Sequence, residues 1–267
     1  MGELPYGTIR RRYSACPIRC QRHDAEICDL SDFFAVFRAL LKEDGTFWFR
    51  GNSDLRFALT PSALRYPTET QRDTALALLS DMKRFLEFKL PRPPRQDEAI
   101  KWVQVAQHYG LPTRLLDWTQ NATVALYFAC CSNPDNDGLV AFLNPIELNQ
   151  HVDPTHPRVL DDERDSALIQ RYLKLGGRRN PNGPRTIAIN PTWNTERIVL
   201  QQGFFTLHGS REFALDDTQA RSLAYVPILK EHKEELRYEL ERAGIGEMFI
   251  FPEPEHVCSH LKRNAHL

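Results

Sequence analysis

Residues 108–128, HYGLPTRLLDWTQNATVALYF, bring together side chains that can bind or transform a ligand. Arg114 and Asp117 are charged, and His108, Tyr109 and Trp118 are aromatic. None of the five falls on the face of a helical pattern. Charge placed among leucines is costly to bury unless it is paired or used. These residues therefore mark a candidate site.

A helix is expected just before this stretch. It runs from about Gln96 and ends where Gly110 and Pro112 form a stop signal. His108 lies in its last turn, where the negative end of the helix dipole is expected to stabilise the cationic imidazole.

A second helix is expected just after it. Asn121 can cap that helix, and alanines and leucines then repeat at helical spacing. The helix is almost entirely apolar, so we expect it to be buried. Arg114 and Asp117, in the loop that leads into it, are expected to be partly buried as well.

Arg50 is a further candidate, because it lies at the end of an aromatic run with strand preference, TFWFRG at residues 46–51. This strand is expected to be central. An arginine at its end can join a structural ion pair or hold an anion such as phosphate, which suits its planar donors. Local sequence leaves both roles open.

The composition is that of an ordinary globular protein. The chain has 267 residues, 42% of them hydrophobic, and a formal net charge of -1. No global basic field therefore indicates nucleic-acid binding, although a local basic face remains compatible with this balance. No apolar run approaches the roughly 20 residues that span a bilayer, and the first residues lack the apolar core of a signal peptide. We expect a cytoplasmic protein without a membrane partner.

Three of the six cysteines and one histidine cluster near the N-terminus as C-x3-C-x2-H-x4-C: Cys16, Cys20, His23 and Cys28. These are zinc-ligand types and lie close enough in sequence to surround a tetrahedral ion. Their spacing matches none of the common paired-knuckle patterns. We therefore expect reduced cysteines rather than a metal site.

The remaining pattern predicts an α+β fold in which early helices pack on a split antiparallel sheet of short strands. Residues 1–30 are expected to form an N-terminal extension and residues 31–267 a single compact domain. Loops are expected at residues 144–160 and 178–184. Further helices are expected over residues 68–90, 161–175 and 230–242, and strands over residues 139–143, 186–189, 197–201, 204–208 and 248–251.

Four segments together resemble the FRG domain family, named for a Phe/Tyr-Arg-Gly motif. They are FWFRG at residues 47–51, HYGLPTRLLDWT at 108–119 with ALYFA at 125–129, QGF at 202–204, and the ending from Gly244-Ile245 to Phe251-Pro252. The segments occur in this order and span most of the chain from about residue 30.

This resemblance implies a distant relationship to ADP-ribosyltransferases, which split NAD at the nicotinamide glycosidic bond. It implies an ADP-ribosyltransferase-like fold with NAD as substrate and no metal. By this comparison Arg50 binds the NAD phosphates, Tyr109 or Trp118 stacks on nicotinamide, and a carboxylate stabilises the ribosyl cation. The NAD contacts it implies are Arg50, Gly51, His108, Tyr109, Arg114, Trp118 and Gln202.

The carboxylate is where this chain departs from the related enzymes. They place a glutamate before a strand and a glycine turn, whereas a direct alignment puts Arg197 at that position and Glu196 one residue away. Because side chains alternate along a strand, a one-residue offset would turn Glu196 to the other face. Glu196, Asp117 and Glu212 remain candidates, as does a different chemistry.

Two functions follow from the resemblance. The first is transfer of ADP-ribose to RNA or protein by a bacterial toxin or anti-phage effector, which an antitoxin-type inhibitor would restrain. The alternative is a non-catalytic module that recognises a nucleic acid or a partner protein. In it, Arg50, Arg114 and Asp117 would form a buried ion-pair network that only fixes the core.

Overall fold

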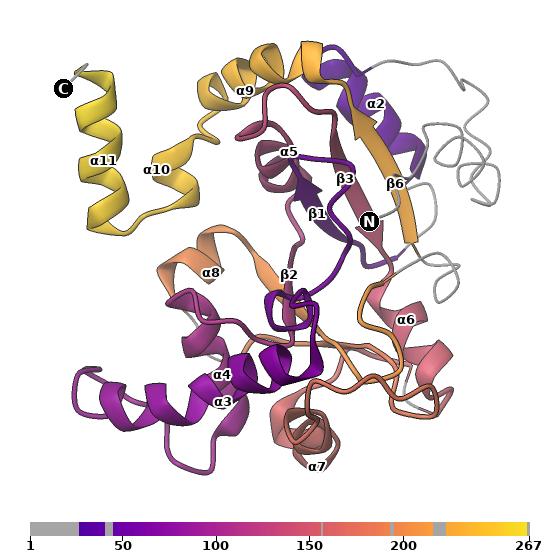
Figure 1. Cartoon of the computed structure of the whole chain (residues 1–267). Helices are drawn as coiled ribbons and strands as arrows, with labels where there is room; N and C mark the ends of the chain where they lie inside the picture. The colour runs from indigo at the N-terminus through magenta and orange to yellow at the C-terminus, as the bar shows by residue number, and fades with distance from the viewer. Residues whose placement is uncertain (1–26, 41–44, 156, 193–194, 216–222, 266–267) are drawn as a thin grey trace.

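The structure is a computed structural model that describes residues 27–40, 45–155, 157–192, 195–215 and 223–265 (Figure 1). It confirms the α+β class with an antiparallel sheet. The strands are β1 (Trp48–Asn52), β2 (Leu115–Thr119), β3 (Gly138–Leu143), β4 (Ile187–Ile189), β5 (Gly203–Leu207) and β6 (Leu223–Ile228), in the sheet order β4-β5-β2-β1-β3-β6. Every neighbouring pair is antiparallel.

Helices surround the sheet along the whole chain rather than early in it. They are α2 (Leu30–Leu40), α3 (Glu69–Leu86), α4 (Ala99–His108), α5 (Ala122–Cys130), α6 (Pro145–Val152), α7 (Asp162–Leu173), α8 (Glu196–Leu200), α9 (Lys233–Arg242), α10 (Glu247–Ile250) and α11 (Pro254–Asn264). Short 3-10 helices occupy Ser62–Leu64 and Lys230–His232. None of the helices that the structure describes is both long and apolar enough to cross a membrane.

The sheet has a narrow join at its centre. β1 pairs with β3 along its whole length, and β2 does so with β5, but β1 and β2 pair at Phe49 with Thr119 alone. The split sheet that we expected is thus one sheet whose two halves open away from a single pair. Arg50 follows that pair on β1, and Asp117 precedes it on β2.

One half of the sheet is covered by α5, with α2 and α9 packed around it. The contact between α5 and β1 is very close at Gly51, where a Cβ would lie 1.8 Å from the Ala125 carbonyl oxygen. Asn121 caps α5 as predicted, since its Oδ1 accepts from the Thr123 N–H at 3.0 Å. The predicted burial of this helix is also confirmed.

The other half is covered by α4 and α7, whose apolar side chains pack against Leu115 of β2 and against β4 and β5. Residues that pair across an antiparallel ladder share a face, and alternate residues of one strand do too. Leu115, Asp117 and Thr119 therefore share a face with Phe49, which packs on α5. Asp117 falls between the two helical covers, and its side chain is 57% exposed in a strand that is otherwise buried.

Several predicted elements are corrected. Residues 197–200 of the predicted strand belong to helix α8 and Gln201 caps its end, because Thr195 starts that helix by accepting from the Ile198 N–H at 3.2 Å. Residues 248–251 are likewise mostly helical, in α10. The predicted loop at 144–160 contains α6, with Asn144 as its cap and Pro145 in its first turn. Asp117, which we expected in a loop, lies in strand β2, and strand β6 was not predicted.

Candidate functional site

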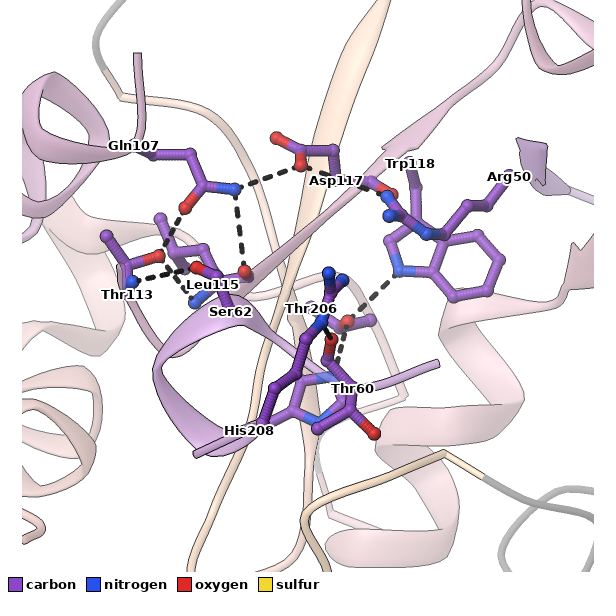
Figure 2. Close-up of polar contacts among 11 residues, drawn as sticks. Arg50, Thr60, Ser62, Gln107, Thr113, Leu115, Asp117, Trp118, Thr206 and His208 are labelled. Atoms are coloured by element: carbon purple, nitrogen blue, oxygen red, sulfur yellow. Dashed lines mark hydrogen bonds and ion pairs between the residues drawn. The ribbon is translucent and has the colours of Figure 1, made fainter. Parts of the chain in front are cut away.

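Arg50 reaches across the open join of the sheet. Its Nη1 donates to the main-chain oxygen of Asp117 at 2.6 Å and lies 3.8 Å from the Asp117 carboxylate (Figure 2). The Arg50 Nε is buried and has no hydrogen-bond partner in the structure. Arg50 lies in the middle of β1 rather than at its end. A guanidinium that is partly exposed, at 20% for the side chain, and keeps an unused donor is suited to hold an anion.

Asp117 is oriented from its other side by Gln107, at the end of α4. Gln107 Nε2 donates to the Asp117 carboxylate at 2.9 Å, while its Oε1 accepts from the Thr113 hydroxyl. Thr113 is fixed in turn, since its hydroxyl oxygen accepts from the Leu115 N–H at 3.1 Å and its own N–H donates to the Ser62 hydroxyl at 3.2 Å. The carboxylate is thus exposed and held in one position.

Positive charge exceeds negative charge at this place. Burial lowers the pKa of Arg50, the Asp117 carboxylate opposes that shift, and the nearby positive charge of Arg65 adds to it. Arg65 is exposed, and its Nε donates to the Thr60 main-chain oxygen at 2.8 Å. Two guanidinium groups beside one carboxylate favour a bound anion.

A chain of buried polar groups lies beneath Arg50. Trp118 Nε1 donates to the Thr206 hydroxyl at 3.0 Å, and that hydroxyl lies 3.1 Å from His208 Nε2. His208 Nδ1 lies 3.2 Å from the Phe213 main-chain oxygen, so Nδ1 carries the proton and Nε2 accepts. Burial lowers the pKa of His208 to about 3. The imidazole is therefore neutral.

This arrangement corrects the expectation for Trp118. Its side chain is part of the buried chain and the residue is only 2% exposed, so its ring is not presented to a ligand. Tyr109, in contrast, is 57% exposed at the end of α4, beside the ring of His108. Tyr109 is the aromatic residue of the stretch that a planar ligand can reach.

Arg114 is also corrected as a ligand contact. It is buried, and its guanidinium donates to the main-chain oxygens of His208, Gly209 and Gly176. Burial lowers its pKa to about 10. Arg114 therefore holds main-chain segments together and takes no part in the Arg50–Asp117 pair. The buried network of three residues that we expected is instead one ion pair, Arg50 with Asp117, whose carboxylate is exposed.

His108 ends α4 as predicted, and Gly110 behind it has a φ of 81°. The expectation of a stabilised cation was wrong, because burial lowers the His108 pKa despite the opposing charge of Glu253. Arg197 also disfavours the cation and itself lies 3.7 Å from a Glu253 carboxylate oxygen, with its guanidinium over the Phe251 ring.

Three further predicted residues are Glu196, Gln202 and Gly51. Glu196 is exposed in the first turn of α8, so strand alternation no longer decides its direction. Gln202 is exposed in the turn between α8 and β5 with a φ of 47°. Gly51 faces α5, so its missing side chain is required by packing whatever else it contacts.

The predicted Cys/His cluster lies largely outside the described residues. Cys16, Cys20 and His23 lie outside the described residues, whereas Cys28 is described and its Sγ lies 3.6 Å from His232 Nε2. Among the residues that the structure describes, no group of three or more His, Cys, Asp or Glu side chains is placed to hold a metal ion.

Sequence reasoning missed the residues that support Asp117 and Arg50. Gln107 and Thr113 belong to the same stretch and to its edge, so their polar type beside Asp117 was an available signal. Arg65 and His208 gave none, because each is separated from the stretch by dozens of residues and only the folded sheet brings it near Arg50.

Comparison with known proteins supports the family and nothing finer. The model of the FRG domain family matches residues 45–138, from the segment before β1 to the start of β3. Over these residues the chain is similar to the FRG domain family. The matched residues include Arg50, Gln107 and Asp117, and therefore the whole pair with its orienting amide. No curated protein and no solved structure matches the chain.

Proposed function

We propose that this protein binds NAD at the Arg50–Asp117 pair and transfers ADP-ribose to an acceptor. The observation that supports this most is Asp117, an exposed carboxylate in the middle of a buried central strand. Positions in a buried strand usually carry apolar side chains, and a charged side chain there often has a function. Beside it, a guanidinium keeps a buried donor unused.

The groups around the pair fit the parts of NAD. Arg50 and Arg65 supply positive charge for the diphosphate, and the exposed ring of Tyr109 offers a face to nicotinamide. Asp117 supplies the negative charge, and Gln107 keeps it directed. The chemistry requires no metal.

In the proposed reaction the bond between the ribose C1′ and the nicotinamide nitrogen breaks. The electron pair leaves with nicotinamide, which becomes neutral, and positive charge develops on the ribose. The Asp117 carboxylate stabilises that charge, and because it is fixed beforehand it needs no reorganisation during the reaction. An acceptor nucleophile then forms the new bond to C1′ and gives up its proton to solvent.

Such an activity fits a bacterial toxin or anti-phage effector that modifies RNA or protein and is restrained by an inhibitor of the antitoxin type. An exposed catalytic carboxylate next to the open join of the sheet would allow an inhibitor to block it by direct contact. This role rests on the transferase chemistry and falls with it.

The test is release of nicotinamide from NAD by the purified protein, together with labelling of RNA and of cell lysate by a tagged NAD analogue. Asp117→Asn keeps the size of the side chain and removes its charge, so we expect turnover to fall about a hundredfold or more. Asp135→Asn, at an exposed turn, makes the same charge change and is expected to leave turnover unchanged.

Glu196→Gln decides between the two carboxylates. If Glu196→Gln removes turnover and Asp117→Asn does not, Asp117 is not the stabilising group. If the wild-type protein neither releases nicotinamide nor labels any acceptor, the transferase proposal is wrong, and the alternative of a non-catalytic binding module takes its place.

A further inference from the structure

A pocket of about 430 Å³ lies apart from the Arg50–Asp117 pair, between the segment after α7 and the turn after β5, and it opens to solvent. Its lining combines two arginines with an amide and a hydroxyl: Leu175, Gly176, Arg178, Arg179, Asn180, Pro181 and Ser210. No part of the proposed transferase chemistry uses these side chains.

The pocket lies in a strongly basic part of the chain. Residues 171–185, RYLKLGGRRNPNGPR, contain one lysine and four arginines and no aspartate or glutamate, while the whole chain has a net charge of -1. Arg171, Lys174, Arg178 and Arg179 are all exposed. A local positive field on a nearly neutral protein favours a polyanionic partner at this one face.

The pocket wall is fixed before anything binds. The Asn180 N–H donates to the Ser210 main-chain oxygen at 2.8 Å, and the Gly183 N–H donates to the Asn180 main-chain oxygen at 2.8 Å. Arg179 Nε donates to the Arg211 main-chain oxygen at 3.2 Å, which holds one edge of its guanidinium and directs the rest. Because the pocket wall is already ordered, ligand binding costs little further conformational entropy there.

A buried arginine, Arg114, and a half-buried one, Arg72, anchor the same segment from below. Arg114 donates to the main-chain oxygens of Gly176 and Gly209, and so ties both sides of the pocket to the start of β2. Arg72 Nε donates to the Gly177 main-chain oxygen at 2.6 Å, and the Gly177 N–H donates to Asp73 at 2.6 Å. Arg114 lies three residues before Asp117, roughly 10 Å along an extended chain.

From these observations we infer that this basic pocket binds the phosphate backbone of a single-stranded nucleic acid. Arginine forks match phosphate oxygens in pairs, and the Asn180 amide and Ser210 hydroxyl can donate to a neighbouring phosphate, sugar or base edge. A carboxylate-rich peptide would also be attracted, but the concentration of four arginines among the five basic residues favours phosphate. The inference does not depend on NAD turnover.

The experiment measures binding of a short fluorescent single-stranded RNA by anisotropy, without NAD, over a range of salt concentrations. Arg178→Glu with Arg179→Glu should weaken binding at least tenfold, because both arginines lose their charge-assisted hydrogen bonds to phosphate and the new carboxylates repel it. Arg178→Ala with Arg179→Ala should also lower the slope of log affinity against log salt by about 1.4, or about 0.7 for each lost phosphate contact.

The matched control is Lys89→Glu with Arg92→Glu, which makes the same charge change in the exposed segment after α3. It is expected to bind RNA within about twofold of wild type, and all variants should keep the wild-type melting temperature. An equal loss in both charge-reversed proteins would overturn the inference, since it would mean that only total charge matters. Absence of RNA binding by the wild type, or equal displacement of RNA by polyglutamate, would overturn it too.

Discussion

At the residue scale, the candidate site depends on how one carboxylate is held. Asp117 accepts from Gln107 on one side and faces the Arg50 guanidinium on the other, while its own main-chain oxygen also accepts from Arg50. Arg50 is therefore attached to the strand even when the carboxylate is changed. Substitutions at position 117 should act on charge and leave the placement of Arg50 largely as it is.

Gln107 is a positioning residue, and its removal should affect catalysis without abolishing binding. In Gln107→Leu the carboxylate loses its 2.9 Å donor. We expect the kcat for nicotinamide release to fall about tenfold with KM nearly unchanged, since the lost bond matters most where charge develops. Gln107→Asn would restore little, because the shorter side chain cannot reach. A fall in kcat/KM that arises from KM alone would contradict this role.

Gly51 is required for packing against α5, and this role can be tested by protein stability without any ligand. A methyl group there would lie 1.8 Å from the Ala125 oxygen and 2.6 Å from the Ala129 nitrogen, both main-chain atoms that cannot move aside. Gly51→Ala should lower the free energy of unfolding by about 3 kcal/mol or prevent folding, as overpacking does. Gly246→Ala, whose nearest neighbour is a side-chain carbon at 3.5 Å, is the control for thermal unfolding. Equal melting temperatures for the two variants would rule out the packing role.

At the element scale, Lys233 joins three segments at the edge of the α5 layer. It begins α9 and is buried, and its Nζ donates to the main-chain oxygens of Ser53, Ser132 and Asn133 at 2.7, 3.3 and 3.1 Å. The latter two follow the end of α5, where carbonyls lack helical partners. One ammonium group thus holds α9, the end of α5 and the segment after β1 together.

Removal of that ammonium should destabilise the protein. Lys233→Met keeps the length of the side chain and leaves three carbonyls without a donor, so we expect the free energy of unfolding to fall by about 1–3 kcal/mol. Lys230→Met changes an exposed lysine three residues earlier and is expected to alter it by less than about 0.5 kcal/mol. Chemical denaturation measures both, and indistinguishable midpoints would contradict the structural role of Lys233.

Local pattern predicted the elements that carry strong signals and failed for short ones. The cap at Asn121 and the apolar spacing after it predicted α5, and the aromatic run at residues 46–51 predicted β1 as a central strand. Residues 197–201 are predicted as a strand because Ile198 and Val199 favour strands, and a three-residue apolar run does not distinguish a strand from a short helix. The cap at Thr195 was the overlooked signal.

Local sequence pattern could not predict strand β6 or the pairing of Arg50 with Asp117. Pro227 argues against a strand, yet β6 lies at the edge of the sheet, where a proline is tolerated. The pairing of Arg50 with Asp117 joins residues 67 positions apart through the sheet order. Local sequence marked both residues as charges in need of a partner, but it did not determine that they are partners of each other.

At the scale of the whole molecule, the buried basic side chains that the structure describes are satisfied mainly by main-chain oxygens. Arg114, Lys233 and His208 all contact carbonyls, and burial lowers the pKa of each. These groups tie distant segments together without a paired carboxylate. Asp117 differs from them, because it is a carboxylate left open to solvent.

The buried His208 makes stability depend on pH in a defined direction. Its pKa is lowered to about 3 in the folded protein, whereas an unfolded histidine titrates near 6.5. The unfolded chain therefore binds more protons below pH 6.5, so the contribution to stability is complete above that pH and is lost as pH falls towards 3. Between pH 7 and 5 we expect His208 alone to reduce the free energy of unfolding by about 2 kcal/mol, at about 1.4 kcal/mol per pKa unit. His208→Asn should be less stable at pH 7 but lose less on acidification.

The comparison isolates His208 because the other groups stay in both proteins. His108, whose pKa is also lowered by burial, adds to the slope of wild type and variant alike. His151→Asn, at an exposed position of α6, should keep the wild-type slope. Urea denaturation at several pH values from 5 to 7 gives these slopes directly. If His208→Asn has the same slope as wild type, His208 is not held neutral in the folded protein, and the chain from Trp118 through Thr206 to Phe213 is not closed as its hydrogen bonds indicate.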